Sequence, residues 1–358
     1  MKWVTRQFSK TAIDRAGRAL AGFDAAANRD AALEIINNWR SCHAFPLNTL
    51  QVALRRLARQ VDSQPIIAQR IKRLSSIDLK LQRFPTMTLS QMQDLGGCRA
   101  IVADLRAALK LAELFRRSNM KHRLHTMDNY IEKPQPSGYR GVHLIYRYYS
   151  DRSSTYNGQK IEIQLRSALQ HSWATAVETV GTFTRHALKS SIGSDRWLRF
   201  FALMGSVMAI REGSNRVSGT PDDIAMLLAE LREISAELDV IKRLAAYGAA
   251  LKQFSSDTTA GAHYFLIELD AAHQRTLVTG FKSEEVREAN AQYLELERRI
   301  TPDSAVDAVL VSVENIALLQ RAYPNYFLDT SAFVDVVSEA LQHTRIRQFR
   351  TRTRAAAG

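Results

Sequence analysis

Apolar residues recur at helical spacing along the first part of the chain. Between residues 8 and 40 they fall every three or four positions, as at Ile13, Ala16 and Leu20, which predicts a helical lead-in. From residue 49 to 81 the same spacing predicts two more helices, separated near Pro65. The positions that define these two helices are Leu50, Leu54, Leu57, Val61, Ile67, Ile71 and Leu74.

Shorter apolar runs in the middle of the chain predict strands that alternate with helices. The run at 97–103 (GCRAIVA) is typical of a buried strand, and a helix is expected at 105–117. Further elements are predicted as strands at 142–149 and 160–166, the second after an Asn-Gly turn at 157–158, and as a helix at 167–186. This order favours an α+β fold in which helices flank a mixed β-sheet.

The last third of the chain begins with a polar stretch at 211–220 (REGSNRVSGT), which is the best candidate for a linker. Thr220 as N-cap and Pro221 at the first helical position predict a helix start, and the apolar stripe that follows to Leu244 predicts one long helix. Beyond residue 255 the order is ββαβα, with elements expected at 263–269, 276–281, 283–300, 306–313, 314–322 and 330–343. The aromatic turn at 323–327 (YPNYF) is expected to serve packing.

Net charge changes this picture, because a formal charge of +13 favours an anionic partner such as a nucleotide, RNA or an acidic membrane. Solvated basic helix faces explain the charge equally well. The two cysteines, Cys42 and Cys98, form no CxxC pair, so neither a disulfide framework nor a structural zinc site is indicated. No signal peptide and no membrane span is evident, which favours a cytoplasmic location.

Three blocks carry candidate chemistry. In the first, residues 70–83 (RIKRLSSIDLKLQR), the basic side chains cluster at the expected end of a helix and could hold a triphosphate, although a basic amphipathic helix explains them as well. In the second, residues 94–101 (DLGGCRAI), Asp94 stands at the mouth of a buried strand. A carboxylate there could ligate Mg²⁺, which prefers oxygen ligands, or it could be an ordinary turn residue.

The third block runs from Asn129 to His143 (NYIEKPQPSGYRGVH) and is followed by the strand IEIQLRS at 161–167. Alternation along that strand puts Glu162, Gln164 and Arg166 on one face, while the apolar residues between them point to the core. An acid, an amide and a base therefore share one surface.

Together these blocks resemble the RelA/SpoT synthetase domain, whose motifs run approximately RxKxxxSIxxKL, DxxGxRI, DYIxxPKxxGYxSxH and ExQxRT in this order. The resemblance covers roughly residues 50 to 190. It implies a nucleotidyltransferase-like synthetase that moves pyrophosphate from ATP to the 3′-hydroxyl of an acceptor. The chain is then divided into a lead-in (1–45), the synthetase domain (46–210), a long helix (220–254), a C-terminal α+β module (255–345) and a basic tail (346–358).

The resemblance also implies a role for each matching residue. Arg70, Lys72, Lys80, Arg83 and Arg99 would bind ATP, and Asp94 and Glu162 would carry Mg²⁺. Glu162 or Gln164 would orient the attacking hydroxyl. The acceptor side would comprise Tyr139, which stacks on the acceptor base, with His143, Gln135 and His171.

Departures from the motifs lie on the acceptor side. Asn129 replaces the acidic start of the DYI motif, Gln135 replaces the Lys after its Pro, and Gly141 replaces the Ser before the final His. The leading hypothesis is alarmone synthesis from GDP or GTP. The alternative is similar to toxic small alarmone synthetases, which pyrophosphorylate the 3′-CCA end of tRNA, since distributed Lys and Arg suit an RNA acceptor. A third interpretation is an inactive RNA-binding module.

No His-Asp dipeptide is present, so the hydrolase domain of bifunctional family members is not expected. The region after residue 220 matches no family motif. We therefore expect the ββαβα module to regulate or neutralise the synthetase, or to support a homo-oligomer through the 224–244 helix.

Overall fold

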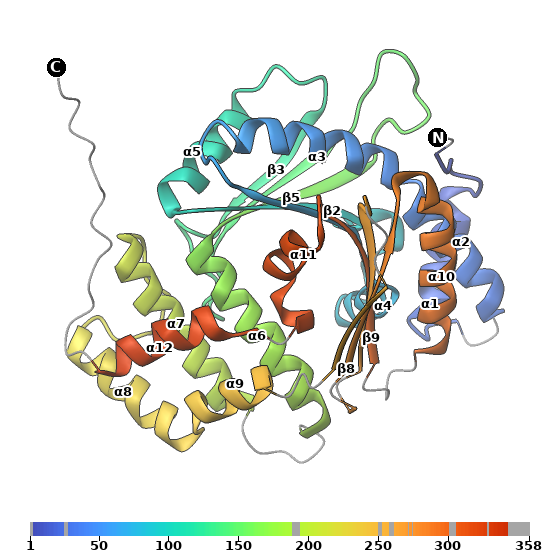
Figure 1. Ribbon diagram of the computed structural model, residues 1–358. Helices are drawn as coiled ribbons and strands as arrows, with labels where there is room; N and C mark the ends of the chain where they lie inside the picture. Colours follow the sequence, from blue (N-terminus) through green and yellow to red (C-terminus); the bar gives the residue numbers. More distant parts are fainter. Residues whose placement is uncertain are drawn as a thin grey trace. The chain divides into compact units, whose positions relative to one another are not determined.

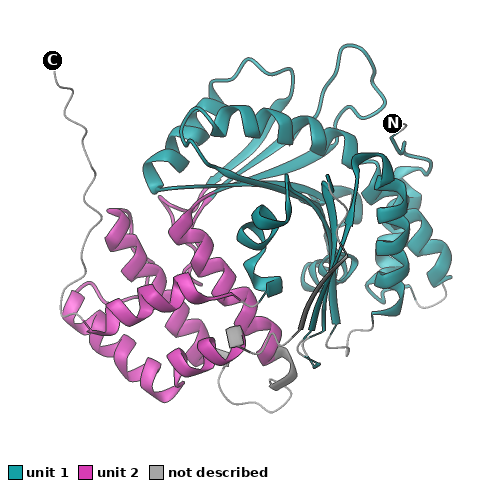
Figure 2. Cartoon of the chain, in the orientation of Figure 1, with its two compact units in different colours: residues 1–128, 142–165, 251–327 teal, residues 129–141, 166–250, 328–358 magenta. Residues whose placement is uncertain are grey.

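The computed structural model describes residues 3–24, 28–187, 194–249, 253–257, 261–270, 272–273, 275–300, 306–327 and 329–342 (Figure 1). The chain forms two compact units, each built from separate stretches of sequence (Figure 2). Unit 1 comprises Met1–Asp128, Val142–Leu165 and Leu251–Phe327, and unit 2 comprises Asn129–Gly141, Arg166–Ala250 and Leu328–Gly358. Each unit is therefore completed by residues from the end of the chain.

A mixed sheet forms the centre of unit 1. In the described part of the chain it has nine strands in the order β3-β4-β5-β2-β1-β9-β7-β8-β6. The strands are β1 (Ile66–Ile71), β2 (Gly96–Val102), β3 (Arg123–Asn129), β4 (Val142–Arg147), β5 (Lys160–Ser167), β6 (Gln253–Asp257), β7 (Tyr264–Asp270), β8 (Arg275–Phe281) and β9 (Val306–Ser312). The strand pairs are antiparallel at β1–β2, β4–β5, β7–β8 and β7–β9, and parallel at β6–β8.

Helices cover both faces of this sheet in unit 1. Short polar side chains cap three of them, because Ser9, Asn28 and Asp104 each accept a backbone N–H from the first turn. Helices α3 and α5 pack on β2, α10 packs on β7 and β9, and α11 packs on β1 (Figure 1). The helices are α1 (Lys10–Leu20), α2 (Arg29–Ser41), α3 (Ala44–Ala58), α4 (Leu74–Arg83), α5 (Leu105–Arg116), α10 (Val286–Arg299) and α11 (Ile316–Ala322), with 3₁₀ turns η1 (Leu89–Gln91), η3 (Ser283–Glu285) and η4 (Pro324–Phe327).

Unit 2 is helical. Its helices are α6 (Ala168–Ala187), α7 (Ser194–Glu212), α8 (Ile224–Glu237), α9 (Val240–Ala249) and α12 (Ser331–Gln342). Their apolar stripes meet in one core that includes Trp173, Phe200, Leu231 and Phe333. Among the described residues, no helix is long and apolar enough to cross a membrane.

The predicted fold class, a mixed sheet flanked by helices, is confirmed. Two element predictions were wrong. Residues 66–71 form strand β1 instead of a helix, because they pair with β2 on one side and β9 on the other. The single helix expected after Thr220 is two helices: α8 starts at Ile224 with Asp223 as its N-cap, and the chain turns at Asp239, which has φ +49°. Strands β3 and β6 had no clear signal in the sequence.

The C-terminal region extends the same sheet, because β9 pairs with β1 at Arg70↔Val311 and Gln69↔Ser312. The expected ββαβα order is present as β7, β8, α10, β9 and α11 in unit 1, whereas α12 belongs to unit 2. The stretch 211–220 lies within unit 2, between α7 and α8.

Candidate functional site

Asp94 lies just before β2 and holds two lysines of the first motif. Its carboxylate oxygens accept from Lys72 Nζ at 2.9 Å and from Lys80 Nζ at 3.1 Å. Lys72 follows the end of β1 and Lys80 lies on α4, so a strand and a helix deliver the two ammonium groups. Burial opposes ionisation of Asp94, but the two lysines outweigh it and hold its pKa below the usual value. Asp94 is therefore a carboxylate at neutral pH.

Glu162 lies on β5 between two polar partners. One oxygen is 3.0 Å from His143 Nδ1, and the other accepts from Gln164 Nε2 at 2.7 Å. Burial raises the pKa of Glu162, and so does the nearby charge of Asp94, but His143 and Gln164 outweigh both and the pKa is lowered. The two predicted metal-binding carboxylates are thus close enough to act on each other electrostatically.

Strand register places the motif arginines on the face that carries Glu162. Arg70 pairs with Gly97 across β1 and β2, and Arg99 is two residues further along β2. A Cβ built on Gly97 would lie 3.9 Å from Glu162 Oε2, so this position of β2 faces the carboxylate. Arg83 differs from this group: it is exposed, and its guanidinium lies over the ring of Phe84 at 5.4 Å.

Two carboxylates whose charges influence each other, beside lysines and arginines, suit a hard divalent cation that shares its ligands with phosphate oxygens. The described residues contain no group of three or more His, Cys, Asp or Glu side chains arranged around one point. The donors present therefore fit Mg²⁺ held by one or two carboxylates and a nucleotide.

Aromatic residues from the C-terminal region lie against the arginines of these motifs. The guanidinium of Arg99 lies over the ring of Tyr323 at 5.2 Å, and Arg99 is 8% exposed. Arg73 forms an ion pair with Asp307 and donates to Tyr326 Oη at 3.1 Å. The YPNYF turn does pack, as expected, but its partners are the basic residues of the first two motifs. No signal in the sequence indicated this pairing.

The predicted acceptor-side residues Tyr139, Gln135 and His171 belong to unit 2. Tyr139 Oη accepts from Arg166 Nε at 3.2 Å, and the Arg166 guanidinium lies 5.1 Å from the centre of the same ring. Gln135 closes the loop tip, since its backbone N–H donates to the Tyr139 carbonyl at 3.1 Å. His171 is buried on α6. His143, also predicted for the acceptor, lies in unit 1 beside Glu162.

Two cations that the sequence analysis did not single out, Arg147 and Lys160, lie on the Glu162 face of the sheet. Arg147 and Lys160 are direct cross-strand partners, two positions along from the pair Ile145↔Glu162. His125 Nε2 lies 3.5 Å from Arg147 Nη2, and Lys160 donates to the Gln91 carbonyl. Burial lowers the pKa of Lys160, and the positive charges of Arg147 and Lys10 lower it further. We call Arg147 and Lys160 the cation cluster.

Comparison with known proteins is consistent with this geometry. The family model described as a region found in RelA/SpoT proteins matches residues 69–182. These residues span β1 to α6 and include every predicted site residue. The chain contains a RelA/SpoT region. The predicted resemblance is thereby confirmed over these residues.

Solved structures of small alarmone synthetases also resemble the chain. Small alarmone synthetase 2 from Bacillus subtilis is 21% identical, with 48% of this chain and 93% of that chain covered and a TM-score of 0.40. Small alarmone synthetase 1 from the same organism is 22% identical, with 55% and 94% covered and a TM-score of 0.39. A GTP pyrophosphokinase family protein from Streptococcus pneumoniae is 20% identical, with 48% and 87% covered and a TM-score of 0.39. No curated protein matches significantly.

Proposed function

We propose that this protein transfers the pyrophosphate group of ATP to the 3′-hydroxyl of a nucleotide acceptor. The observation that carries the proposal is that Asp94 holds Lys72 and Lys80, while Glu162 shares one face of the sheet with the motif arginines. Phosphoryl-group transfer needs charge compensation and in-line positioning more than covalent help from the protein, and these residues supply both.

In the proposed reaction, the acceptor oxygen bonds to the β-phosphorus of ATP and the bond to the α-phosphate oxygen breaks, releasing AMP. Asp94 and Glu162 would hold Mg²⁺, which neutralises phosphate charge when bound. Lys72, Lys80, Arg70 and Arg99 bind the phosphates and stabilise the charge that develops on AMP. Gln164 orients the hydroxyl, and Glu162, which His143 and Gln164 keep ionised, is the group placed to accept its proton.

The acceptor half lies in residues 129–143, and two acceptors are candidates. GDP or GTP, which would give (p)ppGpp, follows from the family region. The 3′ end of tRNA is favoured by the cation cluster, because Arg147 and Lys160 are like charges placed directly opposite each other. Such a pair is unfavourable in the free protein and is relieved by an anion. A polynucleotide supplies a phosphate backbone that can reach this extra site.

Labelled ATP mixed with GDP, GTP or bulk tRNA tests the activity and separates the acceptors. We expect labelled product with wild type and at least about 100-fold less with Glu162→Gln, which keeps the shape but loses the charge. No product with any acceptor, from protein that binds ATP, would leave only the inactive RNA-binding module.

The cation cluster can be tested separately. Arg147→Gln/Lys160→Gln should weaken tRNA binding about tenfold and leave GDP binding unchanged. The slope of log tRNA affinity against log salt concentration should fall by the equivalent of about two phosphate contacts. The matched control is Arg116→Gln/Arg117→Gln, two exposed arginines of unit 1 that pair with Glu113. Equal losses in the two double variants would argue against the tRNA acceptor.

The C-terminal region restrains this activity in our proposal. Tyr323 covers Arg99, and Asp307 and Tyr326 hold Arg73, so ATP must displace residues 316–327 to reach the Arg99 guanidinium. The nucleotide and the aromatic turn therefore compete for the same cation.

A further inference from the structure

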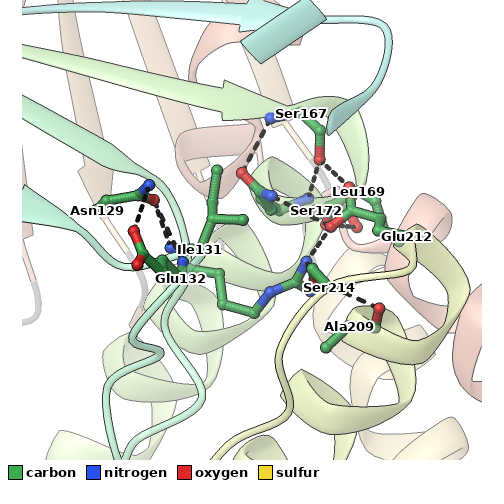
Figure 3. A network of polar contacts seen from close by, with 11 residues as sticks. Asn129, Ile131, Glu132, Ser167, Leu169, Ser172, Ala209, Glu212 and Ser214 are labelled. Atoms are coloured by element: carbon green, nitrogen blue, oxygen red, sulfur yellow. Dashed lines mark hydrogen bonds and ion pairs between the residues drawn. The ribbon is translucent and has the colours of Figure 1, made fainter. Parts of the chain in front are cut away.

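Glu212, the last residue of α7, is a buried carboxylate at the centre of a polar network in unit 2 (Figure 3). It forms an ion pair with Arg140, and both side chains are 3% exposed. Ser167 Oγ donates to one of its oxygens, and Gln170 Nε2 donates to the other at 3.1 Å. Arg140 Nη2 also donates to Ser214 Oγ at 2.9 Å. One carboxylate thus joins the 129–141 loop, the start of α6 and the end of α7.

The two main partners of Glu212 are sequence neighbours of the acceptor-side pair. Arg140 follows Tyr139, and Ser167 follows Arg166. Tyr139 and Arg166 contact each other through a hydrogen bond of 3.2 Å and a cation–π contact of 5.1 Å. Because Glu212 fixes the residue next to each member, it sets the relative position of Tyr139 and Arg166.

Close backbone packing makes the loop depend on α7 for its position. Gly138 has φ +97°, and a Cβ on it would lie 2.5 Å from the Phe201 carbonyl oxygen. A Cβ on Gly205 would lie 2.8 Å from Gly138 Cα. Asn215, beyond the end of α7, donates to the Glu132 carbonyl at 2.7 Å. The loop therefore rests on α7 along its length, and the Arg140–Glu212 pair is the charged contact at its C-terminal end.

We propose that Glu212 is a positioning residue for the acceptor, which acts through Arg140 and Ser167 to hold Tyr139 against Arg166. This inference rests on the proposed function, in which Tyr139 stacks on the acceptor base. A buried carboxylate paired with a buried arginine is suited to this task, because loss of its charge leaves Arg140 buried without compensation.

The test uses the full chain and compares Glu212→Gln with wild type. We expect the Kd for GDP and for bulk tRNA to rise on the order of tenfold, because small misplacements of a positioning group are costly. The Kd for ATP should stay within about twofold of wild type, since the donor motifs lie outside this network. Amide hydrogen exchange should accelerate in residues 130–141 and stay unchanged in α8.

The matched control is Glu230→Gln. It also removes the carboxylate partner of an arginine, Arg199 on α7, but this pair is more exposed than Arg140–Glu212. It should change neither acceptor affinity nor loop exchange. A purely structural role of Glu212 would weaken ATP and acceptor binding equally, and that result would overturn the proposal, as would unchanged exchange in 130–141. If Glu212→Gln does not fold, Ser214→Ala removes only one contact of Arg140 and must shift the same readouts in the same direction.

Failure of the proposed function and failure of the positioning role of Glu212 give different results. Wild-type protein that binds ATP but neither GDP nor tRNA would defeat the proposed function. Normal acceptor binding by wild type, with Glu212→Gln indistinguishable from it, would defeat only the positioning role.

Discussion

At the scale of single residues, partly and fully buried ionisable groups in unit 1 differ in charge state for identifiable reasons. Asp94 and Glu162 stay ionised because each has charged or polar partners at hydrogen-bond distance. His43, also buried, has one polar contact, between Nδ1 and the Trp39 carbonyl at 2.8 Å. Burial lowers the pKa of His43 from 6.5 to about 4, so this ring is neutral in the folded protein.

His43 should make the protein sensitive to acid. The unfolded chain takes up a proton near pH 6.5 while the folded chain does not until about pH 4, so stability falls as pH drops through this window. The loss attributable to His43 is at most ~3 kcal/mol. His43→Asn keeps an amide donor for Trp39 and should remove this part of the pH dependence. Urea unfolding of both proteins at pH 7, 6 and 5 measures it, and parallel pH profiles would contradict the prediction.

At the scale of elements, a buried ion pair connects α10 to the segment that carries the first motif. Arg40 on α2 pairs with Glu297 on α10 at 2.7 Å, and the two side chains are 2% and 8% exposed. Arg40 Nε also donates to the Lys72 carbonyl, and Glu297 accepts from the Leu74 N–H. The C-terminal region therefore supports the backbone that presents Lys72.

Glu297→Gln should destabilise the protein by ~3 kcal/mol, because it leaves the Arg40 guanidinium buried without a counter-charge. ATP binding should weaken as well, since residues 72–74 lose an anchor. Glu295→Gln is the control on the same helix: its pair with Arg299 is exposed, and its removal should change the unfolding free energy by less than ~0.5 kcal/mol. Equal unfolding midpoints in urea for both variants would show that the Arg40–Glu297 pair does not stabilise the protein.

Tyr323→Ala should tighten ATP binding, because it uncovers Arg99. A cation–π contact of this kind is worth ~1–2 kcal/mol, so the gain in affinity is up to about 30-fold. Gln320→Ala, an exposed change on α11, should leave ATP affinity unchanged. Titration calorimetry with ATP measures both, and weaker or equal binding by Tyr323→Ala would show that this aromatic ring does not compete with the nucleotide.

At the scale of the whole molecule, the end of the chain completes both units. Strand β9 covers one edge of β1, and Phe333 on α12 fills the core of unit 2 together with Leu231 on α8. A regulatory region that could be removed cleanly would not share a sheet and a core in this way. Point variants such as those above are therefore the sharper test of regulation.

A chain ending at residue 215 should not behave as an independent synthetase. It would expose an unpaired edge of β1 and lose the apolar stripes of α8, α9 and α12, and such surfaces promote aggregation. We expect the truncated protein to elute as aggregates in size-exclusion chromatography with light scattering, whereas the full chain elutes as a defined species. A soluble fragment with cooperative unfolding and wild-type activity would contradict this view.

The sequence by itself determined the features that depend on near neighbours along the chain. Short motifs located Lys72, Asp94, Tyr139 and Glu162, and periodicity predicted β2, α5 and β5, because alternation and capping are local properties. It failed at β1, where Ile67, Ile71 and Leu74 fit a helical period until pairing with β2 and β9 fixes an extended backbone.

Only the tertiary structure decided what distant segments do to one another. The placement of Tyr323 over Arg99, the opposition of Arg147 and Lys160, and the contacts of Glu212 with the loop and α6 all join residues far apart in sequence. No local pattern encodes such pairs, because they arise when strand register and core packing bring separate elements together. The proposed chemistry therefore follows from the motifs, whereas its proposed restraint and positioning depend on the fold.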